Sequence, residues 1–205
     1  MTTDSPAYDV PLGLHIDGEW ITAGRDTQDV LNPATGKALG ELPMASESDL
    51  DRALDAADRA FRVWRATAPQ ERAAILSRTA ALVRERADRL ATIATLEEGK
   101  PFAEAKGETL AAAALLDFHA GETVRIYGRV LPRPAGTRSL VLHQPVGPVA
   151  AFCAWNFPVL NPVRKLSPAI AAALATTAPI MMAAAGPIAA PPVIHNSNSE
   201  ANSIF

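Results

Sequence analysis

The first regular pattern along the chain is an alternation of apolar and polar residues over residues 14–21. The alternation surrounds Asp17 and Gly18, which is typical of a β-hairpin because this pair tolerates the positive φ of a two-residue turn. Residues 30–37 indicate a strand followed by a turn. Residues 1–13 show no comparable pattern, and we expect them to form a loose N-terminus.

The middle of the chain changes to the three- or four-residue spacing of amphipathic helices. A first helix is predicted to begin at Ser46, whose hydroxyl can cap the first turn, and to reach about residue 64. A second, longer helix is predicted from Pro69 to Gly99, since proline suits a first turn and glycine a helix end. A third, alanine-rich helix is predicted over 102–126.

The pattern then predicts the opening of a parallel sheet. Residues 139–144 alternate as a strand does, and residues 147–153 form a wholly apolar run that is typical of a buried parallel strand. A break at 156–158 precedes helical character over 162–175. Strand, turn and helix in this order begin a βαβ unit, so we assign residues 14–175 to the α/β class. Hairpin and strand elements and three helices lead into the first strand and helix of the sheet.

Composition and charge exclude several functions. The chain has 205 residues, 19 Lys and Arg against 22 Asp and Glu, and a net charge of −3. This balance gives no electrostatic case for nucleic-acid binding. One cysteine excludes an internal disulfide or a cysteine-based zinc or iron–sulfur site, and the four histidines lack ligand spacing, so we expect no metal. The first residues do not resemble a secretory signal, which makes the cytoplasm the expected location.

The end of the chain departs from this balance. Every Lys and Arg lies at or before Lys165, and Glu200 is the only charge beyond it. Residues 176–205 have neither helical nor strand periodicity, and we expect an irregular tail. Residues 166–194 carry no charge and are long enough to span a membrane. Their prolines and their richness in alanine rather than leucine argue against a membrane-spanning segment.

The most informative chemistry lies between Gly147 and Lys165. Ligands of open parallel sheets bind beyond the carboxyl ends of strands, and Cys153 to Asn156 lie at such an end. The side-chain amide of Asn156 can donate hydrogen bonds to an oxyanion. Arg164 can bind a carboxylate with two parallel hydrogen bonds. Cys153 is interpreted as structural rather than nucleophilic, because no His or Lys adjoins it in the sequence.

Several motifs in order carry a family resemblance. They are WNFP at 155–158 followed by Arg164-Lys165, IDGEW at 16–20, NPATG at 32–36, EEGKP at 97–101, IYG at 126–128 and QPVGPVAAF at 144–152. Over about residues 14–175 the chain resembles the N-terminal part of NAD(P)-dependent aldehyde dehydrogenases. Within that family it is most similar to succinate-semialdehyde dehydrogenases.

The resemblance implies oxidation of a small aldehyde to a carboxylic acid with NAD or NADP. A cysteine thiolate attacks the aldehyde, and a glutamate-activated water hydrolyses the thioester. Asn156 matches the catalytic asparagine that holds the oxyanion, and Cys153, Ala154, Trp155 and Asn156 match the stretch that lines the dinucleotide. Arg164 matches the arginine that holds the substrate carboxylate. Family enzymes form dimers or tetramers through a β-hairpin domain, which implies a homo-oligomer.

The sequence also departs from the family pattern. Ala154 stands where the family usually has proline, and no lysine follows Lys165 where a cofactor-binding lysine is expected. The segments with the nucleophilic cysteine and the general-base glutamate have no match, so we expect the chain to be truncated and inactive alone. The alternatives are a non-catalytic fragment that pairs with a full-length paralogue and a truncated product without function.

Overall fold

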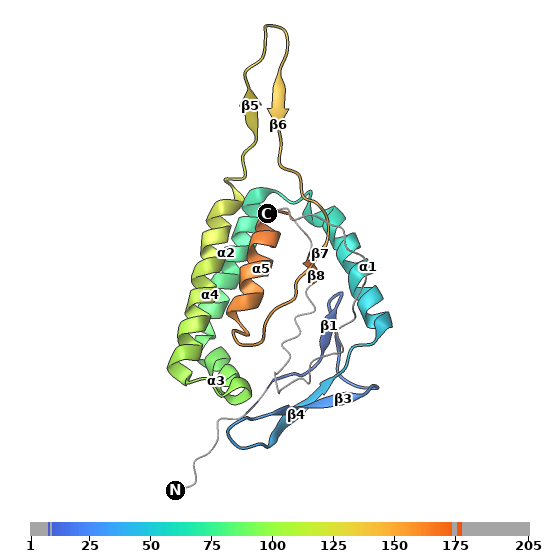
Figure 1. Ribbon diagram of the computed structural model, residues 1–205, viewed down its shortest axis with the longest axis vertical. Coiled ribbons are helices and arrows are strands. Elements are labelled where there is room, and N and C mark those ends of the chain that lie inside the picture. The colour runs from blue at the N-terminus through green and yellow to red at the C-terminus, as the bar shows by residue number, and fades with distance from the viewer. Residues whose placement is uncertain (1–7, 9, 174–175, 178–205) are drawn as a thin grey trace, which may run out of the picture.

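The computed structural model describes Tyr8, residues 10–173 and residues 176–177. Its architecture is mixed α/β, with five helices and small two-stranded sheets among the described residues. Helices α2 (Pro69–Glu85), α4 (Phe102–Thr123) and α5 (Leu160–Ala171) pack side by side. Helix α1 (Glu47–Trp64) lies apart from these three, on the other side of the view (Figure 1). The fold class predicted from the sequence is confirmed at this level.

The predicted N-terminal hairpin is present. Strands β1 (Leu14–Ile16) and β2 (Glu19–Ile21) pair antiparallel. Asp17 and Gly18 form the turn with φ of 53° and 83°, the left-handed values that an Asp-Gly pair tolerates. The alternation therefore reported both the strands and the turn correctly.

A second antiparallel pair follows. Strands β3 (Thr27–Leu31) and β4 (Ala38–Pro43) flank the predicted turn, in which the Asn32 side chain accepts a hydrogen bond from the Ala34 amide at 2.9 Å. This side-chain bond within the turn is the expected use of asparagine. The strand and turn over 30–37 are confirmed, whereas β4 is an additional strand that the sequence pattern did not predict.

Helix α1 (Glu47–Trp64) begins where predicted, with a capping box at its start. The Ser46 hydroxyl accepts from the Asp49 amide, and the Asp49 carboxylate accepts from the Ser46 amide at 2.8 Å. These reciprocal bonds satisfy donors that a helix start otherwise leaves unpaired.

The single long helix predicted from Pro69 to Gly99 is wrong. The structure has two helices, α2 (Pro69–Glu85) and α3 (Ala87–Glu98), separated by a bend at Arg86. Each helix packs its apolar residues into a different cluster against α4, and the bend allows both contacts. The apolar periodicity continues across the bend, without a glycine or proline to mark it. Gly99 ends α3 with φ of 76°, as predicted.

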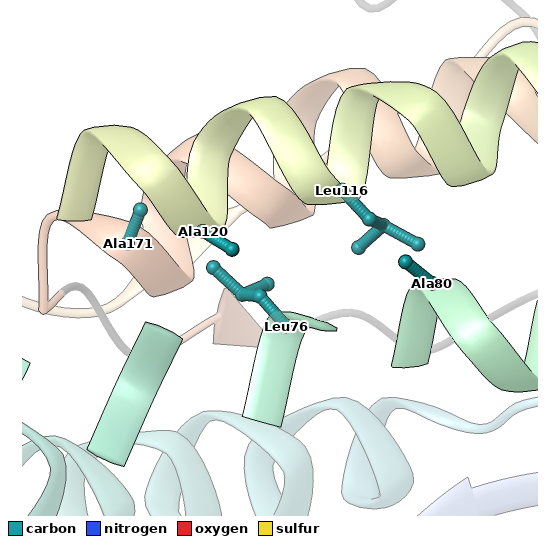
Figure 2. Close-up of a cluster of buried hydrophobic side chains, with 5 residues drawn as sticks. All are labelled: Leu76, Ala80, Leu116, Ala120 and Ala171. Carbon is teal, nitrogen blue, oxygen red and sulfur yellow. The ribbon is translucent and has the colours of Figure 1, made fainter. Parts of the chain in front are cut away.

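The main hydrophobic core lies between α2, α4 (Phe102–Thr123) and α5 (Leu160–Ala171). Its buried members come from these three helices (Figure 2). They are Leu76, Ala80, Leu116, Ala120 and Ala171. Small alanines allow the helix axes to approach closely, as the alanine-rich sequence of α4 predicted. Helix α4 ends at Thr123 rather than near residue 126. Helix α5 overlaps the helical region predicted over 162–175, but it begins two residues earlier and ends at Ala171.

A third hairpin extends away from the helices (Figure 1). Strands β5 (Arg129–Leu131) and β6 (Ser139–Val141) pair antiparallel. The strand predicted over 139–144 is confirmed for its first residues, and β5 was not predicted. Because no helix covers the hairpin in the described part of the chain, apolar side chains stay exposed, including Val130, Leu140 and Leu142.

The predicted parallel strand is confirmed in direction but not in burial. Strand β7 (Val149–Ala150) pairs parallel with β8 (Thr176–Thr177). The expectation of a buried strand over 147–153 is wrong, since Phe152 is 83% exposed and Cys153 is also exposed. An apolar parallel strand is buried only when layers cover both of its faces. Helix α5 lies beside β7, but Ala150 and Phe152 remain exposed.

The expectations of an irregular tail and of a membrane-spanning alternative concern residues that the structure describes only in part. Strand β8 lies at the start of the segment expected to be irregular, and the rest of that tail, 178–205, lies outside the described residues. Among the helices that the structure describes, none combines the length and apolar character needed to cross a bilayer. The membrane alternative for 166–194 falls partly on residues beyond that description.

Candidate functional site

The predicted site residues lie in one loop and the helix after it. The loop over 151–159 connects β7 to α5, and it carries Cys153, Ala154, Trp155 and Asn156, all exposed. Arg164 is exposed on α5. The loop follows the carboxyl end of a parallel strand, where open α/β sheets bind ligands. The structure thus brings the sequence-predicted residues together in one loop and the helix that follows it.

Side chains of α5 hold this loop. The side-chain Nδ2 of Asn161 donates to the Ala154 carbonyl oxygen at 3.1 Å and to Oδ1 of Asn156 at 3.4 Å. Lys165 donates to the Phe152 carbonyl oxygen. Because Oδ1 of Asn156 faces Asn161, the Nδ2 end of Asn156 is the end that can donate to a substrate oxygen.

Asn161 also connects the predicted oxyanion residue to the predicted carboxylate-binding residue. Its Oδ1 accepts from Nη1 of Arg164 at 3.5 Å, the limit of a hydrogen bond. Asn156, Asn161 and Arg164 therefore form a continuous polar row. Sequence reasoning did not select Asn161, although its position five residues after Asn156, immediately before the helix predicted over 162–175, was a usable signal.

A buried ion cluster supports the loop from the opposite side. Lys100 lies between α3 and α4, and its Nζ contacts Oε2 of Glu108 at 2.6 Å and Oε2 of Glu98 at 3.3 Å. The same Nζ donates to the Asn156 carbonyl oxygen at 2.8 Å and lies 4.3 Å from the centre of the Phe157 ring. The side chain of Glu108 is only 2% exposed.

Glu98 and Lys100 belong to the EEGKP motif at the end of α3, and the structure brings both into this cluster. Burial favours the neutral form of Lys100, but the adjacent Glu108 and Glu98 outweigh it and raise the Lys100 pKa. Burial raises the Glu98 pKa; Lys100 opposes this shift, and Glu108 adds to it. Glu108 was not selected from the sequence, in which it is one of four acids in the alanine-rich α4 and nothing local distinguishes it from Glu104, Asp117 and Glu122.

A hollow next to the loop offers space for a ligand. Its volume is about 510 Å³, and it lies between β7 and α5. The lining residues are Val149, Ala150, Ala151, Phe152, Lys165, Pro168 and Ala169. The lining is apolar apart from the ammonium group of Lys165, a combination that small-molecule sites commonly have. Within the described residues, no group of three or more His, Cys, Asp or Glu gathers as metal ligands do.

Comparison with known proteins decides the family. The sequence pattern of the "Aldehyde dehydrogenase family" matches residues 20–177, about three quarters of the chain. The chain belongs to the aldehyde dehydrogenase family. The match includes the loop that carries Asn156 and the helix that carries Arg164, and it confirms the family resemblance inferred from the motifs.

Individual relatives show which members of the family the chain is similar to. Over 159 residues the chain is 45% identical to the Escherichia coli succinate-semialdehyde dehydrogenase [NADP(+)] GabD, covering 77% of this chain and 33% of GabD. A glutarate-semialdehyde dehydrogenase of Pseudomonas putida is 44% identical over 160 residues, with 77% and 33% coverage. The chain thus spans about a third of the length of the curated relatives it matches.

Solved structures agree with this assignment. An aldehyde dehydrogenase from Brucella melitensis biovar abortus matches with a TM-score of 0.79 and 39% identity, over 86% of this chain and 37% of that one. A betaine aldehyde dehydrogenase from Staphylococcus aureus, solved with NAD+, matches with a TM-score of 0.76 and 28% identity, over 80% and 34%. The fold described above is therefore part of the aldehyde dehydrogenase fold.

Proposed function

We propose that this chain supplies the oxyanion-binding and dinucleotide-lining part of a site that oxidises a small semialdehyde with NAD or NADP. The observation that carries the proposal is the position of Asn156, in a loop beyond the carboxyl end of β7 with its Oδ1 facing Asn161. Its Nδ2–H groups remain as donors for an oxygen that gains negative charge. Related enzymes named for succinate and glutarate semialdehydes support the substrate class.

The residues of this chain have separable tasks in that proposal. Asn156 stabilises the oxyanion that forms when a thiolate adds to the aldehyde carbonyl. Phe152 and Lys165 line the hollow in which the dinucleotide would lie, and the exposed Cys153–Asn156 stretch, which follows Phe152 in the loop, would line the cofactor beyond it. A bound NAD or NADP would supply the hydride acceptor. Arg164 would pair with the substrate carboxylate through charge-assisted hydrogen bonds and orient the aldehyde.

The 205 residues alone are proposed to lack turnover. Their only thiol is that of Cys153, which the resemblance assigns to the cofactor-lining stretch. The test is to incubate the purified chain with succinate semialdehyde and either NAD or NADP and to record reduced cofactor. We expect no signal above a heat-denatured sample. Turnover that disappears in Asn156→Ala would refute this part of the proposal.

A chimera tests the role of the site residues. Residues 20–177 replace the matching third of the E. coli enzyme, giving the protein called the chimera below. We expect it to oxidise succinate semialdehyde with NADP. Asn156→Ala should lower kcat by about 10²- to 10³-fold, the usual effect of removing one oxyanion donor. Gln70→Ala, an exposed amide on α2, is the matched control and should leave kcat unchanged.

The exposed β5–β6 hairpin supports a second proposal, association with another copy or with a full-length relative. Val130, Leu140 and Leu142 are 73%, 60% and 65% exposed, which is unusual for neighbouring large apolar side chains. Light scattering of the chain should give a mass above that of a monomer. Leu140→Glu with Leu142→Glu should reduce that mass, whereas Val63→Glu on α1 should not. A monomeric wild-type chain that captures no full-length relative would contradict the proposal.

A further inference from the structure

We infer that Lys100 and Glu108 are positioning residues for Asn156, joined to it through the start of α5. The inference rests on the proposed function of Asn156. Lys100 contacts the Asn156 carbonyl oxygen and the Glu108 carboxylate with one ammonium group, at 2.8 and 2.6 Å. Neither residue lies in the loop that it supports.

Helix α5 begins without a cap from its own sequence. Its N-cap residue is Val159, whose side chain cannot accept a hydrogen bond, and no side-chain bond from the cap position is formed. The first amides of a helix have no partner within the helix and need acceptors from elsewhere. The start of α5 therefore depends on another part of the chain.

Glu108 provides that acceptor from α4. Its Oε1 accepts hydrogen bonds from the amides of Val159 at 2.9 Å and Leu160 at 3.0 Å. The backbone N–H of Asn161 donates to the Phe157 carbonyl oxygen at 2.9 Å, and Pro162 has no N–H. Each amide in this first turn is thereby accounted for. A carboxylate at this end of a helix is also favoured by the helix dipole.

The other oxygen of Glu108 completes the connection. Oε2 contacts Lys100, and Lys100 contacts the Asn156 carbonyl oxygen. The Glu108 carboxylate thus contacts the loop at two places. Its Oε1 holds the end of the loop at Val159, and its Oε2 acts through Lys100 on Asn156. Burial strengthens this arrangement, because the side chains of Glu108 and Lys100 are 2% and 14% exposed. Two backbone constraints on either side of Phe157 leave Asn156 little freedom to turn its amide away.

The test uses the 205-residue chain and two separate signals. A nitroxide attached to Cys153, the only cysteine and an exposed one, reports the motion of the loop. Hydrogen exchange at the amides of Val159 and Leu160 reports the helix cap. Thermal unfolding of each variant is recorded as well, and both signals are measured far below the melting temperature.

The variants separate the two functions of Glu108. Lys100→Met should shorten the rotational correlation time of the label by about twofold or more, while both amides stay protected. Glu108→Gln should give the same result, since the amide oxygen of Gln still caps α5 but does not hold a cation strongly. Glu108→Ala should loosen the label and also speed amide exchange by about tenfold or more. Lys100→Arg keeps the charge and should restore most of the order of the label.

Matched controls lie on the same helix. Lys106 pairs with Asp88 at 2.6 Å, and Glu104 is exposed, so Lys106→Met and Glu104→Gln should change neither signal. Lower melting temperatures in Lys100→Met and Glu108→Gln with an unchanged label spectrum would show a merely structural role and overturn the inference. If Glu108→Ala does not fold, Lys100→Met and Glu108→Gln still test whether Lys100 and Glu108 position Asn156. Neither signal needs an aldehyde or a dinucleotide, so an inactive chimera would refute the proposed function and leave this result intact.

Discussion

The phenol of Tyr8 donates a hydrogen bond to the carboxylate of Glu97, 89 positions later in the chain. This bond ties the segment before the first hairpin to the last turn of α3. Burial raises the pKa of Glu97; the bond from Tyr8 opposes that shift, and the charge of Glu98 adds to it. Burial and the neighbouring Glu97 also raise the Tyr8 pKa. Ionised Glu97 is therefore an unfavourable group in the folded chain.

Glu97→Gln should stabilise the protein at neutral and alkaline pH. A carboxyl with a raised folded pKa contributes stability below its ordinary value, near 4.3, and loses that contribution as pH rises through the folded value. Gln removes the buried charge and keeps an oxygen for Tyr8. Urea unfolding at pH 8 should show a higher midpoint for the variant, and the advantage should vanish near pH 4. Glu104→Gln serves as the exposed control; an equal or lower midpoint for Glu97→Gln at pH 8 would contradict this account.

Asp49 is expected to behave in the opposite way. Hydrogen bonds from Arg25 and Ser46 hold its pKa well below the usual range. A depressed folded pKa contributes stability above the unfolded value, near 4, and that contribution is lost as pH falls below it. Asp49→Asn should therefore lower the melting temperature at pH 7, with a smaller difference at pH 3. The exposed Asp55→Asn on the same helix should show no such pH dependence, and a constant difference for Asp49→Asn would refute the explanation.

The elements that the sequence predicted well are those with local signals. Asp17-Gly18 specifies its own turn, and Ser46 with Asp49 specifies a helix start within four residues. The motif around Asn156 likewise lies in a single loop, which follows the carboxyl end of β7. Each of these features depends on residues that are close in sequence, so it could be predicted without knowledge of the rest of the fold.

The failures depend on partners distant in sequence. The bend at Arg86 serves two packing clusters against α4, and no local residue marks it. The apolar run at 147–153 is typical of a buried strand, but burial depends on layers that the strand itself does not specify. The role of Glu108 needed the fold as well, because 51 positions separate it from the Val159 amide.

The core makes a simple prediction about stability. Leu76 is 1% exposed between α2, α4 and α5, and its small neighbours cannot fill the space that a truncation leaves (Figure 2). Leu76→Ala should reduce the free energy of unfolding by about 2–5 kcal/mol. Leu82→Ala on the same helix, where the side chain is 44% exposed, should cost much less. Similar losses in the two variants, measured by urea unfolding, would show that the three helices do not form the core.

Arg164 offers the sharpest test of substrate choice. In the chimera, Arg164→Met should raise KM for succinate semialdehyde by about 10- to 100-fold, since a charge-assisted pair with the carboxylate is lost. The KM for a neutral aldehyde such as propanal should change little, and so should the KM for NADP. Arg78→Met, on the exposed side of α2, controls for the loss of a surface charge.

The outcome separates binding from positioning at this site. Arg164 is connected to Asn156 through Asn161. Nη1 of Arg164 lies 3.5 Å from Oδ1 of Asn161, whose Nδ2 donates to Asn156. If Arg164 acted mainly by ordering that row, Arg164→Met would lower kcat for both aldehydes equally. A selective increase in KM for the carboxylate-bearing substrate instead identifies Arg164 as the residue that binds it. An equal loss with propanal would therefore contradict the substrate role, while leaving the assignment of Asn156 to be judged by its own variant.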